Sequence, residues 1–239
     1  MPQIHNGYIL HQGSSFLARG DITVIVTGLK TPSSNPKTGP MLQVWVIPTD
    51  GYPSEIAKRS RTVAHPTCGF CPLRDRVCYV NLSGVNQVYR SYLLGNYPVM
   101  TKPVIKVIEL LKPNVRITAY GEAPAAPFDA FEPLIEACNQ VTGYTHLWGN
   151  CDDRWRNYLM ASVESTEAAQ KAQSMGWKTF RILRPNEPLN EGEIYCKNHV
   201  NPSIQCDKCL LCGGANSPHS IAIPVHGRGS KNNRFILNK

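Results

Sequence analysis

The first sixty residues carry the pattern of β-strands. Runs rich in valine, isoleucine and aromatic residues lie at 7–10, 21–29 and 41–48, and Gly, Ser, Pro and Asn separate them. The polar segment 29–40 between the last two runs contains three prolines. Its Lys37-Thr38-Gly39 sequence could touch a phosphate, but no glycine-rich run precedes the lysine, so an ordinary loop is favoured over a phosphate loop.

From residue 79 onward, helical spacing alternates with short apolar runs. The spacing predicts one helix over 83–95 and a second that opens at Lys102-Pro103, followed by a buried strand at 115–121. The positions expected to face inward on these two helices are Val85, Val88, Tyr92, Leu93, Val104, Val107, Ile108 and Leu111.

The same alternation continues to the end of the chain. A helix is expected from Asp129, with Glu132 completing a capping box, and another after the cap residue Ser165. Strands are expected at 144–149, 160–165, 178–184 and 220–226. Strand–helix–strand repetition predicts right-handed crossovers and a parallel sheet, with functional groups at the carboxyl ends of its strands.

Composition narrows the class of protein. The chain has 239 residues and a net charge of +8, and no run approaches the ~20 apolar residues of a membrane helix. Its start lacks the pattern of a secretory signal, so we expect a cytoplasmic protein with no membrane partner. Half of the net charge lies in the last 14 residues, which hold four Lys or Arg and no acid. Such a tail is usually a solvated end, and less often contacts nucleic acid.

Nine cysteines are the strongest chemical signal. Three lie within 68–78 and four within 196–212, whereas Cys138 and Cys151 stand alone. Clusters of this kind in a reducing compartment indicate metal ligands rather than disulfides. Cys138 is expected on the apolar face of its helix, as part of the hydrophobic core. Cys151 is expected in an ordinary loop beside Asp152.

The first cluster, Cys68, Cys71 and Cys78, supplies three ligands and no local fourth. A structural zinc would recruit its fourth ligand from His65, Cys138 or Cys151. Alternatively, the three thiols hold a [4Fe–4S] cluster and leave one iron open for chemistry.

The second cluster is Cys196, Cys206, Cys209 and Cys212. Its C-x2-C-x2-C core has the short cysteine spacing that lets each thiolate bind a different iron of a [4Fe–4S] cubane. Structural zinc sites more often use two separated C-x2-C pairs, so iron–sulfur is favoured and zinc is the alternative. Four ligands make this a closed site, structural or electron-relaying.

The cysteine loop at 68–78 is followed by helical sequence and then by a strand that ends in Tyr120-Gly121-Glu122. This order resembles the radical-SAM superfamily, although the spacing here is C-x2-C-x6-C rather than C-x3-C-x2-C. The resemblance implies a partial (β/α) barrel with an open cluster. It also implies that Gly121 and Glu122 meet the amino group of S-adenosylmethionine, and that Ser162 and Glu164 reach its ribose.

A second resemblance covers most of the chain. Five segments are similar to an uncharacterised family of phage and mobile-element proteins of the "gene product 88" type: residues 34–39, the cysteine loop with Tyr79, residues 120–122, 161–165 and 223–227. The similarity implies a single integrated domain that contains both cysteine clusters. It implies no particular activity.

These observations predict an α/β fold in four parts. They are a β-rich N-terminal subdomain (1–60), an α/β core (61–190), the second cysteine cluster with the last strand (191–227) and a basic tail (228–239). The leading hypothesis is a radical-SAM-like iron–sulfur enzyme with an unknown substrate and an electron donor as partner. The alternative is a non-enzymatic, metal-stabilised protein that binds nucleic acid through its tail. A nuclease ranks last, because no run of metal-binding carboxylates is present.

Overall fold

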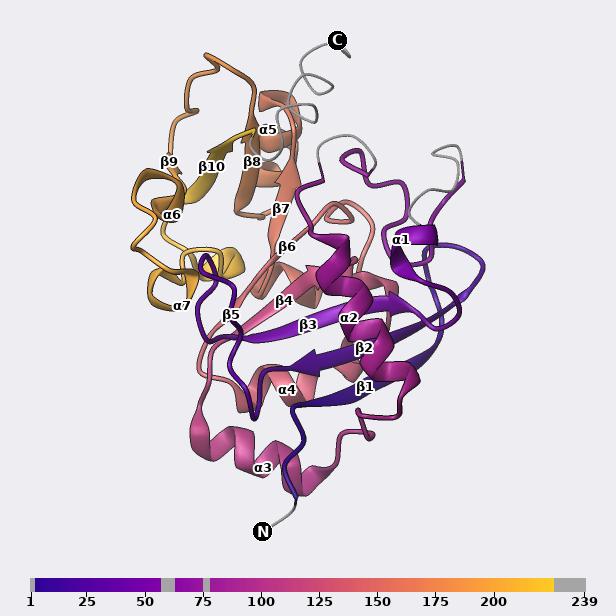
Figure 1. Ribbon diagram of the computed structural model, residues 1–239. Coiled ribbons are helices and arrows are strands. Elements are labelled where there is room, and N and C mark those ends of the chain that lie inside the picture. The colour runs from indigo at the N-terminus through magenta and orange to yellow at the C-terminus, as the bar shows by residue number, and fades with distance from the viewer. Residues whose placement is uncertain (1–2, 57–62, 75–77, 226–239) are drawn as a thin grey trace.

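Ten strands form two five-stranded sheets in a computed structural model that describes residues 3–56, 63–74 and 78–225 (Figure 1). The first sheet has the order β1-β2-β3-β4-β5, and the second has the order β6-β7-β8-β10-β9. The strands are β1 (Gly7–Ser14), β2 (Asp21–Thr27), β3 (Leu42–Pro48), β4 (Val115–Tyr120), β5 (Val141–Thr142), β6 (Tyr144–Thr145), β7 (Met160–Val163), β8 (Thr179–Leu183), β9 (Glu193–Tyr195) and β10 (Ser220–Pro224). The predicted α/β class is confirmed, and the described strands do not close into a barrel.

The first sheet combines antiparallel and parallel pairing. β1, β2 and β3 pair antiparallel, whereas β3 with β4 and β4 with β5 pair parallel. The three strands expected at the start of the chain therefore share a sheet with β4 and β5. The boundaries at 60 and 190 stay predictions.

Gly143 carries the chain from the first sheet into the second, because it is the one residue between β5 and β6. A Cβ at this position would lie 2.5 Å from the carbonyl oxygen of Ile117 and 2.7 Å from Leu159. Only glycine lets the chain pass so close to β4. All strand pairs of the second sheet are parallel, as the repeated strand–helix pattern predicted.

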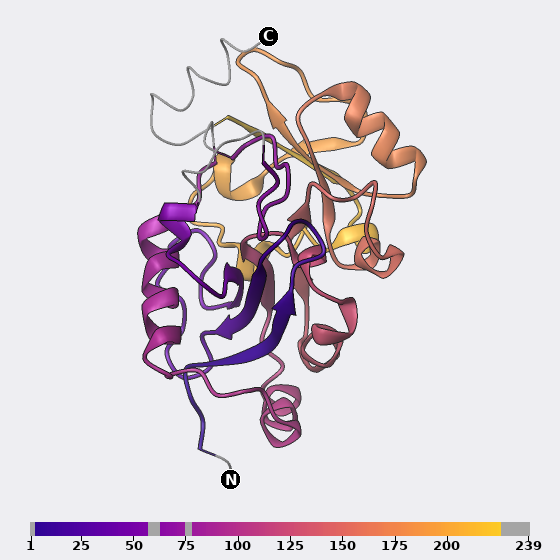
Figure 2. The same ribbon diagram turned by 90° about the vertical axis from the view of Figure 1, so that its right-hand side faces the viewer.

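Helices cover both faces of the first sheet and one face of the second (Figures 1 and 2). α2 (Leu82–Leu93) packs on the face that includes Ile25 and Ile47. α3 (Lys102–Leu111) and α4 (Glu132–Ala137) lie on the opposite face, and α5 (Thr166–Ser174) packs against β7 and β8. Ser165 caps α5 as predicted, accepting a hydrogen bond from the backbone N–H of Ala168.

The remaining helical elements are short: α1 (Pro53–Ile56), α6 (Lys197–Val200), α7 (Cys206–Cys209) and the 3-10 turns η1 (Ala123–Ala125), η2 (Phe128–Ala130), η3 (Asp153–Asn157) and η4 (Gly214–Asn216). Among the described residues, no helix combines the length and the apolar character needed to cross a lipid bilayer.

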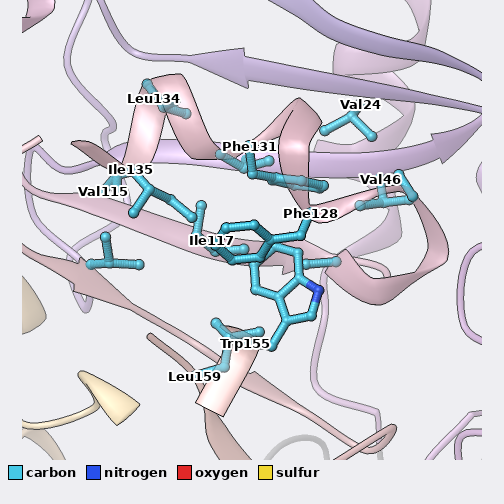
Figure 3. Close-up of a cluster of buried hydrophobic side chains, with 14 of the residues drawn as sticks. Val24, Val46, Val115, Ile117, Phe128, Phe131, Leu134, Ile135, Trp155 and Leu159 are labelled. Carbon is cyan, nitrogen blue, oxygen red and sulfur yellow. The ribbon is translucent and has the colours of Figure 1, made fainter. Parts of the chain in front are cut away.

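One hydrophobic core joins the two sheets. Side chains from β2, β3, β4, α4 and the segment before β7 meet there (Figure 3). The aromatic rings of Phe128 and Phe131 both contact Trp155 edge to face, with ring centroids 4.8 and 5.0 Å apart. The labelled members of this core are Val24, Val46, Val115, Ile117, Phe128, Phe131, Leu134, Ile135, Trp155 and Leu159.

Two details of the predicted helices are wrong. Leu93 and Leu111 lie at the ends of α2 and α3 and are 56% and 67% exposed, because the last turn of each helix extends past its packing partner. The helix expected from Asp129 begins at Glu132 instead, with no capping box. Pro133 explains the shift, since proline fits the first turn of a helix and would remove a hydrogen bond one turn later.

Several predicted strands are shorter than the apolar runs that indicated them. The run at 144–149 is a strand only at Tyr144 and Thr145, and the run at 160–165 ends at Val163. The residues after these points turn out of the sheets and carry polar side chains. The run at 220–226 is a strand to Pro224, and His226 lies outside the described residues.

Candidate functional site

Three polar side chains follow the carboxyl ends of three neighbouring strands. Glu122 comes after β4, His146 directly after β6 and Glu164 directly after β7. His146 bridges the two carboxylates: its Nδ1 lies 3.1 Å from Glu122 Oε1, and its Nε2 lies 2.9 Å from Glu164 Oε1. The rule that functional groups gather at the carboxyl ends of parallel strands is therefore obeyed.

His146 is held as a cation by this arrangement. Burial alone lowers the pKa of His146, but the charge of Cys71 and the side-chain hydrogen bonds with Cys71, Glu122 and Glu164 outweigh burial and raise the pKa well above its usual value. A protonated imidazole donates from both nitrogens, so each carboxylate receives one ring N–H. The ring thereby fixes the position of both carboxylates.

Glu122 is buried and accepts further hydrogen bonds. The hydroxyl of Thr145 and the backbone N–H of His146 both donate to its carboxylate. With the His146 ring, three donors hold the group. A carboxylate has about four acceptor directions, so capacity for one more donor remains.

The cysteine loop is fastened to the end of β4. The backbone N–H of Glu122 donates to the carbonyl oxygen of Thr67 at 2.7 Å. His65 and Gly69 exchange two backbone hydrogen bonds across the turn, and Gly69 has a φ of +52°, which glycine adopts without strain. Cys68 is thereby placed beside Glu122.

The three thiols of this loop interact with one another. Burial raises the pKa of the Cys68 thiol, a hydrogen bond with Thr67 lowers it, and the neighbouring Cys71, Glu122 and Cys78 raise it further. Cys71 Sγ also lies 3.6 Å from His146 Nδ1. A thiol whose pKa is raised as that of Cys68 is stays protonated unless a cation replaces its proton, which is the electrostatic condition of a metal site.

A cavity of about 610 Å³ opens beside the loop. Cys68, Cys71 and His146 line one wall, and Cys151 lines it as well. Cys151 was expected in an ordinary loop, and the structure places it in this cavity. Cys78 lies on the other side of the loop, against the second sheet.

The second cysteine set gathers around its own small cavity, of about 40 Å³. Cys196, Cys206, Cys209 and Cys212 all line it. Burial raises the pKa of Cys212, and the neighbouring Cys206 and Cys196 raise it further. These four thiols line the same cavity, although Cys196 is ten residues before Cys206 in the chain.

Both cysteine sets contact one hydrophobic cluster on the second sheet. Cys71 and Cys78 of the first set and Cys196 and Cys212 of the second all pack against it. Tyr79 lies between the sets: burial raises its pKa to about 12, with contributions from the charges of both Cys78 and Cys212. The two clusters predicted from the sequence therefore belong to one region of the molecule.

The other predicted site residues divide into two groups. Glu164 joins the site through His146, and 26% of its side chain is exposed. Ser162 is buried within β7 and lines neither of the two cavities beside the thiols. Cys138 lies in the hydrophobic core, as expected.

His146 was not among the residues predicted for the site. The apolar run 144–149 indicated one continuous strand, which placed His146 inside a sheet. Because β6 ends at Thr145, His146 is instead the first residue past the carboxyl end of a parallel strand. Gly143 lies before this run and does not mark where β6 ends, so no local signal singled out His146.

Comparison of the chain with models of protein families, with curated proteins and with solved structures returned no match.

Proposed function

We propose that the protein is an iron–sulfur enzyme that binds S-adenosylmethionine at an open cluster and cleaves it reductively, as radical-SAM enzymes do. One observation carries the proposal. The three-cysteine loop is fastened to the end of β4 by the hydrogen bond between Glu122 and Thr67, beside a cavity lined by Cys68 and Cys71. Two thiols of the loop thus line a cavity, and the buried carboxylate of Glu122 lies near Cys68 at the carboxyl end of a parallel strand.

The spacing of the thiols supports a cluster over zinc. Among the described residues, Cys71, Glu122 and His146 are the one group of three whose ligand atoms all lie within 4.8 Å of one another. No three thiols of either set meet at that distance. Sulfurs about 2.3 Å from a tetrahedral zinc lie only about 3.8 Å apart, so the wider spread suits separate corners of a cubane.

Each part of the chain then has a role. Cys68, Cys71 and Cys78 would hold three irons, and a bound [4Fe–4S] cluster would supply the electron for the cleavage. Glu122 keeps acceptor capacity for the ammonium group of the substrate, and the charged ring of His146 prevents its carboxylate from turning away. Glu164 lines a different cavity from the one beside the thiols, so its proposed contact with a ribose hydroxyl, like that of Ser162, has only the resemblance behind it.

The strand arrangement is compatible with a partial barrel. β3, β4 and β5 are parallel neighbours in the first sheet, and β6, β7, β8 and β10 are parallel neighbours in the second, with Gly143 carrying the chain from β5 to β6. The cysteine sets lie on the face of the second sheet opposite to α5. We propose that this curved run of strands is the radical-SAM-like half-barrel expected from the sequence.

The four-thiol set would hold a second, closed cluster. Its neighbourhood supports a bracing role, because the N–H groups of Cys206 and Asp207 donate to the carbonyl oxygens of Lys37 and Thr38. Its position on the same hydrophobic cluster as Cys71 and Cys78 also suits electron transfer between the two sites.

A Glu122→Gln variant tests substrate binding. The holo protein, purified without oxygen, is expected to bind S-adenosylmethionine, and Glu122→Gln to weaken binding by roughly tenfold because a neutral amide loses the charge-assisted hydrogen bond. Equilibrium dialysis with labelled S-adenosylmethionine measures the affinity. Iron content should not change, since Glu122 is not a cluster ligand.

The exposed Glu109→Gln on α3 is the matched control and should bind as the wild type does. Suppose that Glu122→Gln binds S-adenosylmethionine as tightly as the wild type and has wild-type iron content. Gly121 and Glu122 would then not have the binding role that the radical-SAM resemblance implies. No binding by a protein that carries its clusters would remove S-adenosylmethionine from the proposal altogether.

One observation favours a second candidate, a mononuclear metal site at Cys71, Glu122 and His146. The distance from Cys71 Sγ to His146 Nδ1 is 3.6 Å and that from His146 Nδ1 to Glu122 Oε1 is 3.1 Å. A tetrahedral zinc would place such sulfur and nitrogen ligands about 3.5 Å apart. This candidate leaves Cys68 and Cys78 without a role, so it ranks second.

The nucleic-acid alternative rests on the basic tail 228–239, which lies outside the described residues. It therefore stays a prediction from the sequence, as does the similarity to the phage and mobile-element family. Neither is needed for the enzyme proposed above.

A further inference from the structure

A larger cavity, of about 980 Å³, lies on the other side of Tyr79 from the thiol loop. It is bounded by residues 31–38, by β2, β3 and β4, by the start of α2 and by α6. Lys37 and Arg116 both line it. Among the described residues that line it, none is Asp or Glu.

The two cations are oriented by aromatic side chains rather than by acids. Arg116 donates from Nη2 to the hydroxyl of Tyr144 at 2.7 Å, and its guanidinium lies 5.4 Å from the centre of the same ring. Lys37 Nζ lies 5.8 Å from the centre of the Tyr79 ring. Within the described part of the chain, neither cation lies within ion-pair distance of a carboxylate. Both cations also line the small cavity of the second thiol set, where burial raises the pKa of Cys206 and their charges act to lower it. In the larger cavity the same two positive charges favour an anion.

The N-terminus of α2 adds to the positive potential. Asn81, which caps the helix, and Gly84 in its first turn both line the cavity. The first turn contains no acidic residue. The positive end of a helix of 12 residues therefore faces the same space as the two cations.

Apolar side chains also line the cavity. Trp45, Val80 and Ile223 line it, and Trp45 is fixed because its Nε1–H donates to Thr27 Oγ1 at 2.9 Å. The cavity is much larger than an inorganic ion needs. Its occupant should therefore join an anionic group to a planar or apolar part.

We propose that this cavity binds a small molecule that carries a phosphate group, with the phosphate between Lys37 and Arg116 and a planar part against Trp45. The forked guanidinium of Arg116 suits phosphate oxygens, and Lys37 supplies a mobile point charge. A nucleoside monophosphate has both required parts.

The proposal does not rest on S-adenosylmethionine binding, because none of the residues that carry it lines the cavity beside the first thiol set. The position of Lys37 does depend on the second set, since its carbonyl oxygen accepts the N–H of Cys206. The protein must therefore be tested with its metal complement intact. The earlier expectation of an ordinary loop at residues 37–39 still describes the backbone, which is not a phosphate loop.

Isothermal titration calorimetry of the holo protein tests the proposal with inorganic phosphate, pyrophosphate, adenosine monophosphate and adenosine. Saturable binding is expected for adenosine monophosphate, with weaker binding of the two inorganic anions. Adenosine should bind about tenfold or more weakly than its monophosphate, because it lacks the charged group.

Lys37→Gln should weaken the binding of adenosine monophosphate by roughly tenfold. Arg116→Lys should also weaken it, because lysine cannot donate two parallel hydrogen bonds to a phosphate as the planar guanidinium does. Lys30→Gln, at an exposed position of the same segment outside the cavity, is the matched control and should bind normally. Thermal unfolding of each variant confirms that it has folded. Lys37→Gln alone suffices if Arg116→Lys does not fold.

Three results would overturn the proposal. The first is no saturable binding of phosphate, pyrophosphate or adenosine monophosphate. The second is equal affinity for adenosine and its monophosphate, or an affinity that Lys37→Gln leaves unchanged. The third is binding of a single-stranded oligonucleotide while the small phosphates do not bind, which would make this face a nucleic-acid site.

Discussion

At the scale of single residues, one glycine sets the distance between the thiol loop and β4. Gly121 has a φ of +78°, in the left-handed region, and a Cβ there would lie 2.5 Å from the carbonyl oxygen of Val46. It would also lie 3.1 Å from the carbonyl oxygen of Thr67, which accepts the N–H of Glu122. Any larger residue would push the loop away from Glu122.

Gly121→Ala is therefore expected to destabilise the fold by about 2–4 kcal/mol, through left-handed strain and steric overlap. Urea unfolding followed by circular dichroism measures the change. Gly84→Ala is the control, because nothing lies within 4 Å of its Cβ position and alanine favours the helix by about 0.5–1 kcal/mol. Equal stability of Gly121→Ala and wild type would contradict the role given to this glycine.

The chemistry of individual residues was only partly predictable. The cysteines and Glu122 could be selected because thiols and a carboxylate in such patterns have few other uses. Gly121 was expected to meet S-adenosylmethionine, which stays a prediction, and the structure shows a steric need for glycine there. His146 could not be selected, because its role depends on where β6 ends and on carboxylates 24 and 18 residues away.

At the scale of elements, β4 departs from a regular strand where it approaches the site. Its register against β3 shifts between Gln43 and Trp45, and Thr118 has a φ of +69°. A β-branched residue in this conformation is strained, and its hydroxyl donates to the carbonyl oxygen of Tyr144. The irregularity changes the direction of the strand just before Gly121. No local pattern in residues 115–121 indicates it, because it arises from pairing with two neighbours.

β8 carries a buried cation that joins the end of the second sheet to its middle. Arg181 is fully buried, and its Nε and Nη2 donate to the two carboxylate oxygens of Glu193 at 2.8 and 2.7 Å. Nη2 also donates to the carbonyl oxygen of Pro188. Glu193 begins β9, a three-residue strand that was not predicted, because its formation depends on this pairing rather than on its own sequence.

Arg181→Met should cost about 3–5 kcal/mol, since it leaves the carboxylate of Glu193 buried without its partner. Thermal unfolding measures the loss. Lys171→Met, at an exposed position on α5, removes the same charge from the surface and should change stability by less than about 0.5 kcal/mol. A similar small change in both variants would show that the buried pair adds little.

At the scale of the whole molecule, the two cysteine sets and the two cavities that they line lie where the sheets meet. Gln205 donates to the carbonyl oxygen of Pro36 across 169 positions of sequence, so the polar loop near the start is held by the second cysteine set. The α/β class and the parallel second sheet followed from local periodicity. The position of the 29–40 loop could not be predicted from local periodicity, because its hydrogen-bond partners lie near the other end of the chain.

The central claim is that both thiol sets hold iron–sulfur clusters, and metal analysis of protein purified without oxygen tests it most directly. The account predicts about eight irons and eight acid-labile sulfides per chain, and about half of each in the triple variant with alanine at Cys68, Cys71 and Cys78. One or two zinc ions per chain, with no acid-labile sulfide, would contradict it.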